Sequence, residues 1–121
     1  MGGEIHVVCN SQGGECRVGL VGRITIDSSP DLRTYLLERL ECTGCQGVAV
    51  DFYDVIYIDT SGLAMLVEVL KFARTRGKGF SLSGLRDRPR YLLEATRLLH
   101  LFHEVDRNPP DFSDLIPGCA I

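Results

Sequence analysis

The stretch that most constrains the fold is residues 48–72, where a strand pattern passes directly into a helical pattern. Residues 48–52 are mainly apolar, which is typical of a strand in the middle of a sheet that helices cover. From Thr60 the apolar residues recur at intervals of three and four and predict a helix to Arg76. Gly77 then ends the helix, because a left-handed cap costs glycine least. The polar segment between the two patterns therefore joins a predicted strand to a predicted helix.

The chain before this stretch predicts a hairpin followed by a helix. Residues 4–10 alternate in polarity and precede a turn signal, so they predict the first strand. Residues 15–26 predict the second strand, with a bend or bulge at Gly22. Residues 27–30, Asp-Ser-Ser-Pro, have the polar cap and early proline of a helix start, and a leucine stripe follows them.

The chain after Gly77 predicts a strand over 80–83, a helix over 89–99 and a closing strand over 102–105. A hairpin followed by strands that alternate with helices predicts an α/β fold. We expect a mixed sheet of four to five strands with the helices packed mainly on one side. We further expect one domain over 1–106 and an irregular C-terminal tail over 107–121, which holds prolines and acids.

Charge and hydropathy argue against two classes of partner. Lys and Arg number 13 against 16 Asp and Glu, so the basic footprint of a nucleic-acid-binding protein is missing. The basic group at 86–90 includes its own acid and predicts a solvated turn before a helix rather than a phosphate site. No apolar run approaches the roughly 20 residues of a membrane-spanning helix, and the N-terminus lacks a signal-peptide layout. We therefore expect no membrane insertion and a cytoplasmic location.

The residues that commonly catalyse reactions or bind metals show no recognisable arrangement. Cys42 and Cys45 have the CxxC spacing of a zinc or redox pair, but a second ligand pair is missing and they follow a predicted helix. His6, His100 and His103 lie far in sequence from the junction hydroxyls. No phosphate loop or nucleophile-elbow pattern is present. We expect a protein that is not an enzyme and that needs no cofactor or metal.

The junction itself has two interpretations on residue chemistry alone. Asp59, Thr60 and Ser61 can each cap the helix that follows, which would give them a purely structural role. The same helix start favours anions, and Gly62 would let a bound group approach the backbone. The residues alone leave both interpretations open.

A resemblance to a known family bears on the choice between these two interpretations. Residues 59–63, Asp-Thr-Ser-Gly-Leu, follow a hydrophobic strand that contains Asp51 and resemble the signature of STAS domains, especially bacterial anti-sigma factor antagonists. Residues 22–33 resemble the family's second-strand-to-first-helix segment, and residues 92–105 resemble its last helix and strand. The resemblance covers roughly residues 4–106.

The resemblance implies a switch that acts through protein binding. In that family the residue after the junction aspartate is a serine or threonine that a partner kinase phosphorylates, and phosphorylation ends binding to that partner. Carried over, the acceptor is Thr60, with Ser61 as second choice. The unphosphorylated chain would bind an anti-sigma factor with serine kinase activity and so release a sigma factor. The alternative is the STAS subunit of an ABC-type lipid transporter, which would bind its ATPase.

The expected partner-binding surface surrounds Thr60, and the oligomeric state stays open. Met65, Val69 and Phe72 either pack against neighbouring helices or form a partly exposed patch that the partner covers. Where the family often has acids after the second-strand glycine, this chain has Arg23 and Thr25, so an acidic contact is lost or reversed. The complete set of candidate partner-binding residues is Asp27, Ser28, Asp59, Thr60, Ser61, Gly62, Leu63, Met65, Val69 and Phe72.

Overall fold

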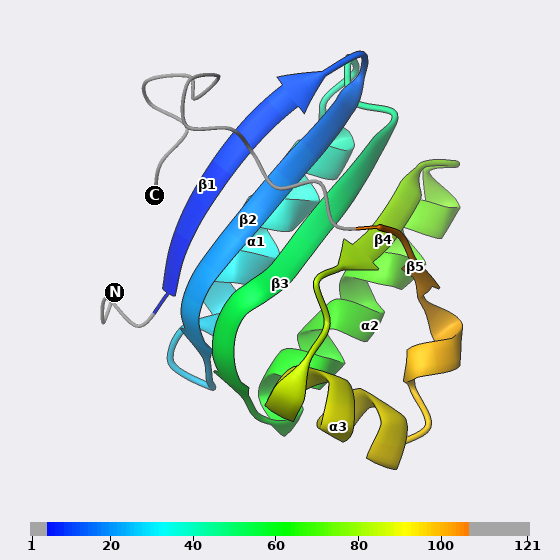
Figure 1. Ribbon diagram of the computed structural model, residues 1–121. Coiled ribbons are helices and arrows are strands. Elements are labelled where there is room, and N and C mark those ends of the chain that lie inside the picture. Colours follow the sequence, from blue (N-terminus) through cyan, green and yellow to red (C-terminus); the bar gives the residue numbers. More distant parts are fainter. Residues whose placement is uncertain (1–4, 107–121) are drawn as a thin grey trace.

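A five-stranded mixed sheet, in the order β1-β2-β3-β4-β5, frames residues 5–106, the part of the chain that this computed structural model describes (Figure 1). The first two strands form an antiparallel hairpin, and each later strand pairs in parallel with the strand before it. The predicted mixed α/β sheet is confirmed. The strands are β1 (Ile5–Gln12), β2 (Glu15–Ile24), β3 (Gly47–Ile58), β4 (Gly79–Ser83) and β5 (His103–Glu104).

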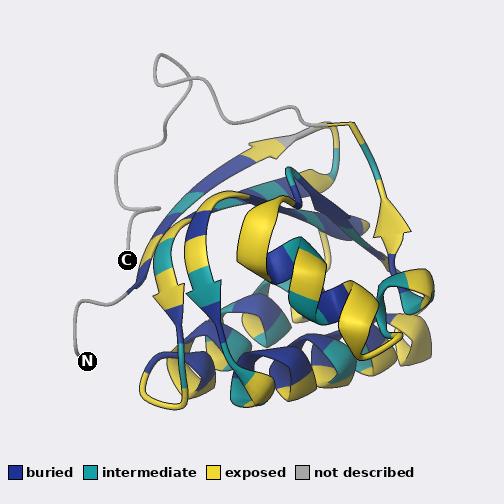
Figure 2. Cartoon of the chain, turned by 60° about the horizontal axis from the view of Figure 1, so that its bottom comes forward, coloured by how far each residue is buried: buried dark blue, intermediate teal, exposed yellow. Residues whose placement is uncertain are grey.

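Two long helices cover one face of this sheet, and a third lies beside the end of β3 (Figure 1). α1 (Ser29–Glu41) and α2 (Thr60–Thr75) pack on each other and on the sheet. α3 (Asp87–Ala95) contacts β3 and precedes a short 3-10 turn, Leu99–Leu101. The buried residues gather where the helical layer meets the sheet (Figure 2). Alternation along the strands explains this, because every second side chain points to the same face.

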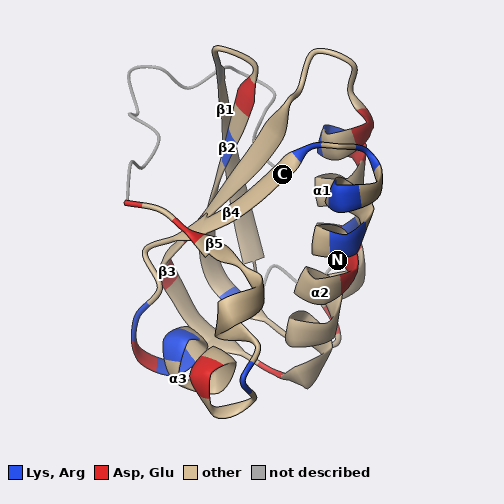
Figure 3. Ribbon diagram, turned by 90° about the vertical axis from the view of Figure 1, so that its right-hand side faces the viewer, with Lys and Arg blue, Asp and Glu red and all other residues tan. Residues whose placement is uncertain are grey.

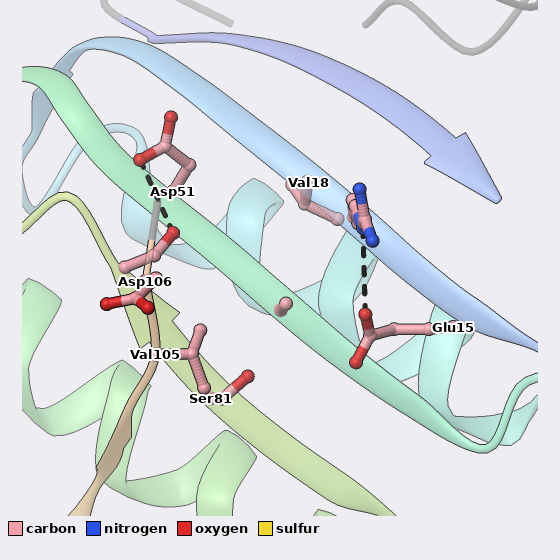
Figure 4. A pocket seen from close by; sticks show the side chains of 9 residues that line it. Glu15, Val18, Asp51, Ser81, Val105 and Asp106 are labelled. Carbon is pink, nitrogen blue, oxygen red and sulfur yellow. Dashed lines mark hydrogen bonds and ion pairs between the residues drawn. The ribbon is translucent and has the colours of Figure 1, made fainter. Parts of the chain in front are cut away.

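The opposite face of the sheet holds a shallow hollow of about 210 Å³ (Figure 4). Small side chains form much of its floor, and Asp51 lies within it with only 8% of its surface exposed. The Asp51 carboxylate accepts hydrogen bonds from the Tyr53 amide (3.3 Å) and the Ser83 hydroxyl (3.4 Å). Gly84 makes this arrangement possible, since a Cβ there would come within 2.2 Å of Asp51 Oδ1.

The two largest differences from the predicted boundaries are at the ends of β3 and α3. β3 runs to Ile58 instead of residue 52, because β2 continues to pair with it as far as Ile24 through two register shifts. The third helix was predicted over 89–99, but α3 ends at Ala95. Two residues later, Arg97 adopts a left-handed φ of 60°, which is incompatible with a continuing helix. The predicted C-terminal tail, 107–121, lies outside the described residues.

Candidate functional site

Asp59 organises the junction between β3 and α2. Its Oδ1 accepts hydrogen bonds from the Gly62 amide (3.1 Å) and the Ser61 hydroxyl (2.5 Å), and its Oδ2 accepts the Ile26 amide (3.1 Å). It is therefore the N-cap of α2, as the sequence allowed. Because Ile26 belongs to the segment between β2 and α1, the same carboxylate also joins the ends of two neighbouring strands.

The hydrogen bonds of this carboxylate favour its charged form. Burial acts to raise the pKa of Asp59, but the hydrogen bonds from Ser61, Gly62 and Ile26 outweigh it, so the net shift is downwards. The negative charge also lies at the positive end of the α2 dipole, where it is stabilised. Asp59 thus holds the junction in its ionised form at neutral pH.

The two candidate hydroxyls have different surroundings. Thr60, the first residue of α2, is exposed, and its hydroxyl has no hydrogen-bond partner among the described residues. Ser61 is half-buried; its hydroxyl donates to Asp59 and accepts from the Ser29 hydroxyl at 3.4 Å. A kinase could reach the Thr60 hydroxyl without breaking a hydrogen bond between described residues. The Ser61 hydroxyl would first have to break its hydrogen bonds with Asp59 and Ser29.

Gly62 has a different role from the one predicted. It is buried against the sheet, and a Cβ there would lie 2.6 Å from Ile58 and 2.8 Å from Ile24. The absence of a side chain therefore lets the first turn of α2 pack closely on β2 and β3. The expectation that Gly62 contacts a bound group or a partner was wrong, because it faces the core.

The turn between β2 and α1 lies beside this junction and contains two candidate residues. Ser28 is 1% exposed, and its hydroxyl donates to the Arg23 carbonyl and accepts from the Thr25 amide, both at 2.9 Å. It closes the turn and cannot meet a partner; it also makes no side-chain cap of α1, contrary to the prediction. Asp27 is exposed and stays available for contact.

The expected partner patch on α2 is mostly core. Leu63, Met65 and Val69 are 3%, 3% and 0% exposed, because they form one broad buried face of α2 together with Leu66 and Leu70. Their assignment to partner binding was wrong, and packing within the domain is the correct alternative. Phe72 is half-buried in a groove between α1 and α2, with the Arg76 guanidinium 4.7 Å from its ring centre.

Other residues at this end of the sheet are more exposed than the predicted ones. Ile26 and Ile56 are 70% and 68% exposed, an unusual degree for isoleucine. Tyr57 has the guanidinium groups of both Arg23 and Arg88 over its ring, at 4.5 and 4.6 Å from the centre. The sequence contained two separate signals for this group, Arg23 in place of a family acid and the basic cluster at 86–90, but it did not predict that they come together around Tyr57.

The described residues contain no group of three or more metal-ligating side chains, and no helix among them is both long and apolar enough to cross a bilayer. The CxxC pair is split, since Cys42 is exposed whereas the Cys45 thiol is buried and donates to the Gly47 carbonyl. Two further buried thiols, Cys9 and Cys16, lie 3.1 Å apart, and their hydrogen bond together with burial raises the pKa of Cys16.

Comparisons with known proteins agree with this geometry. A family model described as "Mlab, STAS domain" matches residues 7–103. An anti-sigma factor antagonist from Mycobacterium paratuberculosis superposes with a TM-score of 0.74 at 17% identity, over 91% of this chain and 89% of that one. The phosphorylated form of the Bacillus cell fate determinant SpoIIAA gives 0.67 at 11% identity, over 84% and 91%.

A third structure comes from a different functional context. A sulfate transporter family protein from Wolinella succinogenes gives a TM-score of 0.64 at 22% identity, over 74% of this chain and 72% of that one. At these identities the structural likenesses show a shared fold. The family model covers most of the chain and includes the whole Asp59–Thr60–Ser61–Gly62 junction, and on this ground the chain belongs to the STAS domain family.

Proposed function

We propose that this chain is a protein-binding switch that Thr60 controls. In the unphosphorylated form it binds an anti-sigma factor with serine kinase activity and releases a sigma factor, and phosphorylation of Thr60 ends the association. The observation that carries this proposal is the contrast between two adjacent hydroxyls: that of Thr60 is exposed and has no hydrogen-bond partner within residues 5–106, whereas that of Ser61 is hydrogen-bonded. The chain needs no catalytic activity of its own, and the reaction places it in the cytoplasm, where ATP is available.

The position of Thr60 explains how phosphorylation could act without refolding. A phosphate adds about −1.5 to −2 charge at neutral pH, and a helix N-terminus tolerates that charge through its unpaired N–H groups and dipole. The contacts of Asp59 with Ser61, Gly62 and Ile26 do not involve the Thr60 side chain, so they can persist. The charge would then change the contact surface and leave the fold intact. SpoIIAA, which has this fold, exists in a phosphorylated form.

The test is phosphorylation by the candidate anti-sigma kinase, with phosphopeptide mapping of wild type, Thr60→Ala and Thr43→Ala. Thr43 is an exposed threonine in the loop after α1 and serves as the matched control. We expect one phosphate on Thr60, loss of labelling in Thr60→Ala and unchanged labelling in Thr43→Ala. Binding of the kinase to Thr60→Glu should weaken about tenfold or more, since the added charge meets a surface that fits the neutral hydroxyl. Phosphate on a residue other than Thr60 would contradict the proposal.

A second candidate function is that of a STAS domain that serves a transporter, and the likeness to the sulfate transporter family protein favours it. Binding to an ATPase is the expectation from the sequence alone. The alternative expected from the sequence was an ABC-type lipid transporter. Both functions use a contact surface around Thr60, but only the first requires covalent modification. Tight binding to a transporter ATPase, without phosphate transfer from any candidate kinase, would favour the second function over the first.

A further inference from the structure

Two tyrosines of β3 are covered by arginines from two other segments of the chain. The Arg23 and Arg88 guanidinium carbons lie 4.5 and 4.6 Å from the ring centre of Tyr57, and the Arg86 guanidinium carbon lies 3.7 Å from the ring centre of Tyr53. These distances are typical of cation–π contacts. We call these five residues the Tyr–Arg surface.

The backbone holds these arginines in place. Arg86 Nε donates to the Tyr53 carbonyl at 2.9 Å, and Arg88 Nε donates to the Ile58 carbonyl at 3.4 Å. Arg23 is the register partner of Tyr57 on the adjacent strand β2. Because a hydrogen bond and a ring contact already orient the Arg86 and Arg88 side chains, a partner that binds them loses less conformational entropy than it would with unrestrained arginines.

Arg88 retains unused capacity for hydrogen bonding. Its Nε donates to the Ile58 carbonyl and its guanidinium stacks over the Tyr57 ring, but the described residues provide no carboxylate as an ion-pair partner. A guanidinium has five N–H donors, so its terminal amino groups can still bind a carboxylate in a bidentate way. Arg86 already lies 3.9 Å from the Asp87 carboxylate, which makes Arg88 the principal charged group for an incoming ligand.

Exposed isoleucines place this surface beside Thr60. Ile56 immediately precedes Tyr57 in β3, and the Ile26 amide is bound to Asp59, the residue before Thr60. Both isoleucines are more than two-thirds exposed. A protein partner could cover them with its own apolar side chains, as happens at the centre of many interfaces.

We propose that the Tyr–Arg surface recognises acidic side chains of the partner protein, with carboxylates paired to Arg23 and Arg88 and apolar side chains over Ile26 and Ile56. This inference rests on the proposed function and deepens it, because it states the chemistry of the partner's surface. Where STAS antagonists often carry acids after the second-strand glycine, this chain carries Arg23, so its partner would have the reversed charge.

The charges around the surface favour a protein over a nucleic acid. Asp27 and Asp54 are exposed at the same end of the sheet, Asp59 accepts the amide of Ile26 next to Asp27 and is ionised, and Figure 3 shows both signs of charge around α3. A polyphosphate would meet these acids as well as the arginines and would be repelled by them. A folded partner can place a carboxylate opposite an arginine and a donor opposite an aspartate. A phosphate on Thr60 would add negative charge close to the carboxylates of that partner and so oppose binding.

The first test measures the affinity of the kinase that phosphorylates Thr60 for charge-reversed variants. Arg23→Glu and Arg88→Glu should each weaken binding about tenfold or more, with a reduced dependence on salt. Arg76→Glu is the matched control, since Arg76 also covers a ring at 4.7 Å but lies at the far end of α2. Circular dichroism would verify that all three variants are folded. Equal affinity of wild type and both charge-reversed variants would overturn the proposal.

The second test needs no kinase and therefore separates failure of this inference from failure of the proposed function. A synthetic peptide that alternates glutamate and leucine is titrated into the full chain, and its glutamine counterpart serves as the control. We expect NMR shifts at Arg23, Tyr57 and Arg88 with the glutamate peptide alone, and their loss in Arg88→Glu. Shifts elsewhere, or stronger binding of a single-stranded oligonucleotide or of anionic vesicles than of the peptide, would overturn the acidic-protein assignment.

Discussion

β3 contributes to two polar sites, one around Asp51 near its middle and one around Asp59 just beyond its end, and they are built in different ways. Asp59 finds most of its donors within three residues, at Ser61 and Gly62, and leaves the intervening hydroxyl exposed. Asp51 is buried and accepts one local hydrogen bond, from the Tyr53 amide, and one from the Ser83 hydroxyl, which lies 32 residues away. The first site is local and presents a reactive group, whereas the second depends on tertiary packing and presents none.

The largest expected effect concerns the tertiary site. Gly84→Ala should lower the free energy of unfolding by about 3 kcal/mol, because a left-handed residue gains a side chain and that side chain meets Asp51 and the Tyr53 backbone. Gly77→Ala is the matched control, since Gly77 has the same φ of 67° with nothing within 4 Å of its Cβ. That control should cost about 1 kcal/mol. If urea denaturation gave the same loss in the free energy of unfolding for both variants, the residues around Asp51 would have adjusted to the added methyl group.

The contrast between the sites also explains what could be predicted from sequence. The Asp59 cap, α2 and the Gly77 end were recognisable because their determinants are neighbours in the chain. The Tyr–Arg surface was not, since it joins residues 23, 53–57 and 86–88 across three segments. For a related reason the sequence left the burial of Met65 and Val69 open, because the width of a buried helix face depends on how far the sheet beneath it extends.

A smaller effect should follow from the charge of Asp59. Its folded-state pKa is lowered, so its ionised form stabilises the fold above the unfolded value, near 3.9, and this contribution is lost as the pH falls through the lower folded value. Asp59→Asn keeps a capping side chain but removes the charge. Urea denaturation of both proteins should show a less stable variant at pH 7 and a difference that disappears in acid. A constant difference down to pH 2 would mean that shape, and not charge, accounts for the role of Asp59.

The smallest expected effect is the one most directly tied to function. Thr60→Ala should change the free energy of unfolding by no more than about 0.5 kcal/mol, because its exposed hydroxyl has no partner among the described residues. Ser61→Ala should cost about 1 kcal/mol, since it removes the hydroxyl that joins Asp59 to Ser29. Thermal and urea unfolding of the two variants would measure how much each of these adjacent hydroxyls contributes to the free energy of unfolding. If Thr60→Ala were the more destabilising change, Thr60 would be part of the cap, and its phosphorylation would have to disturb the start of α2 rather than act only on the surface.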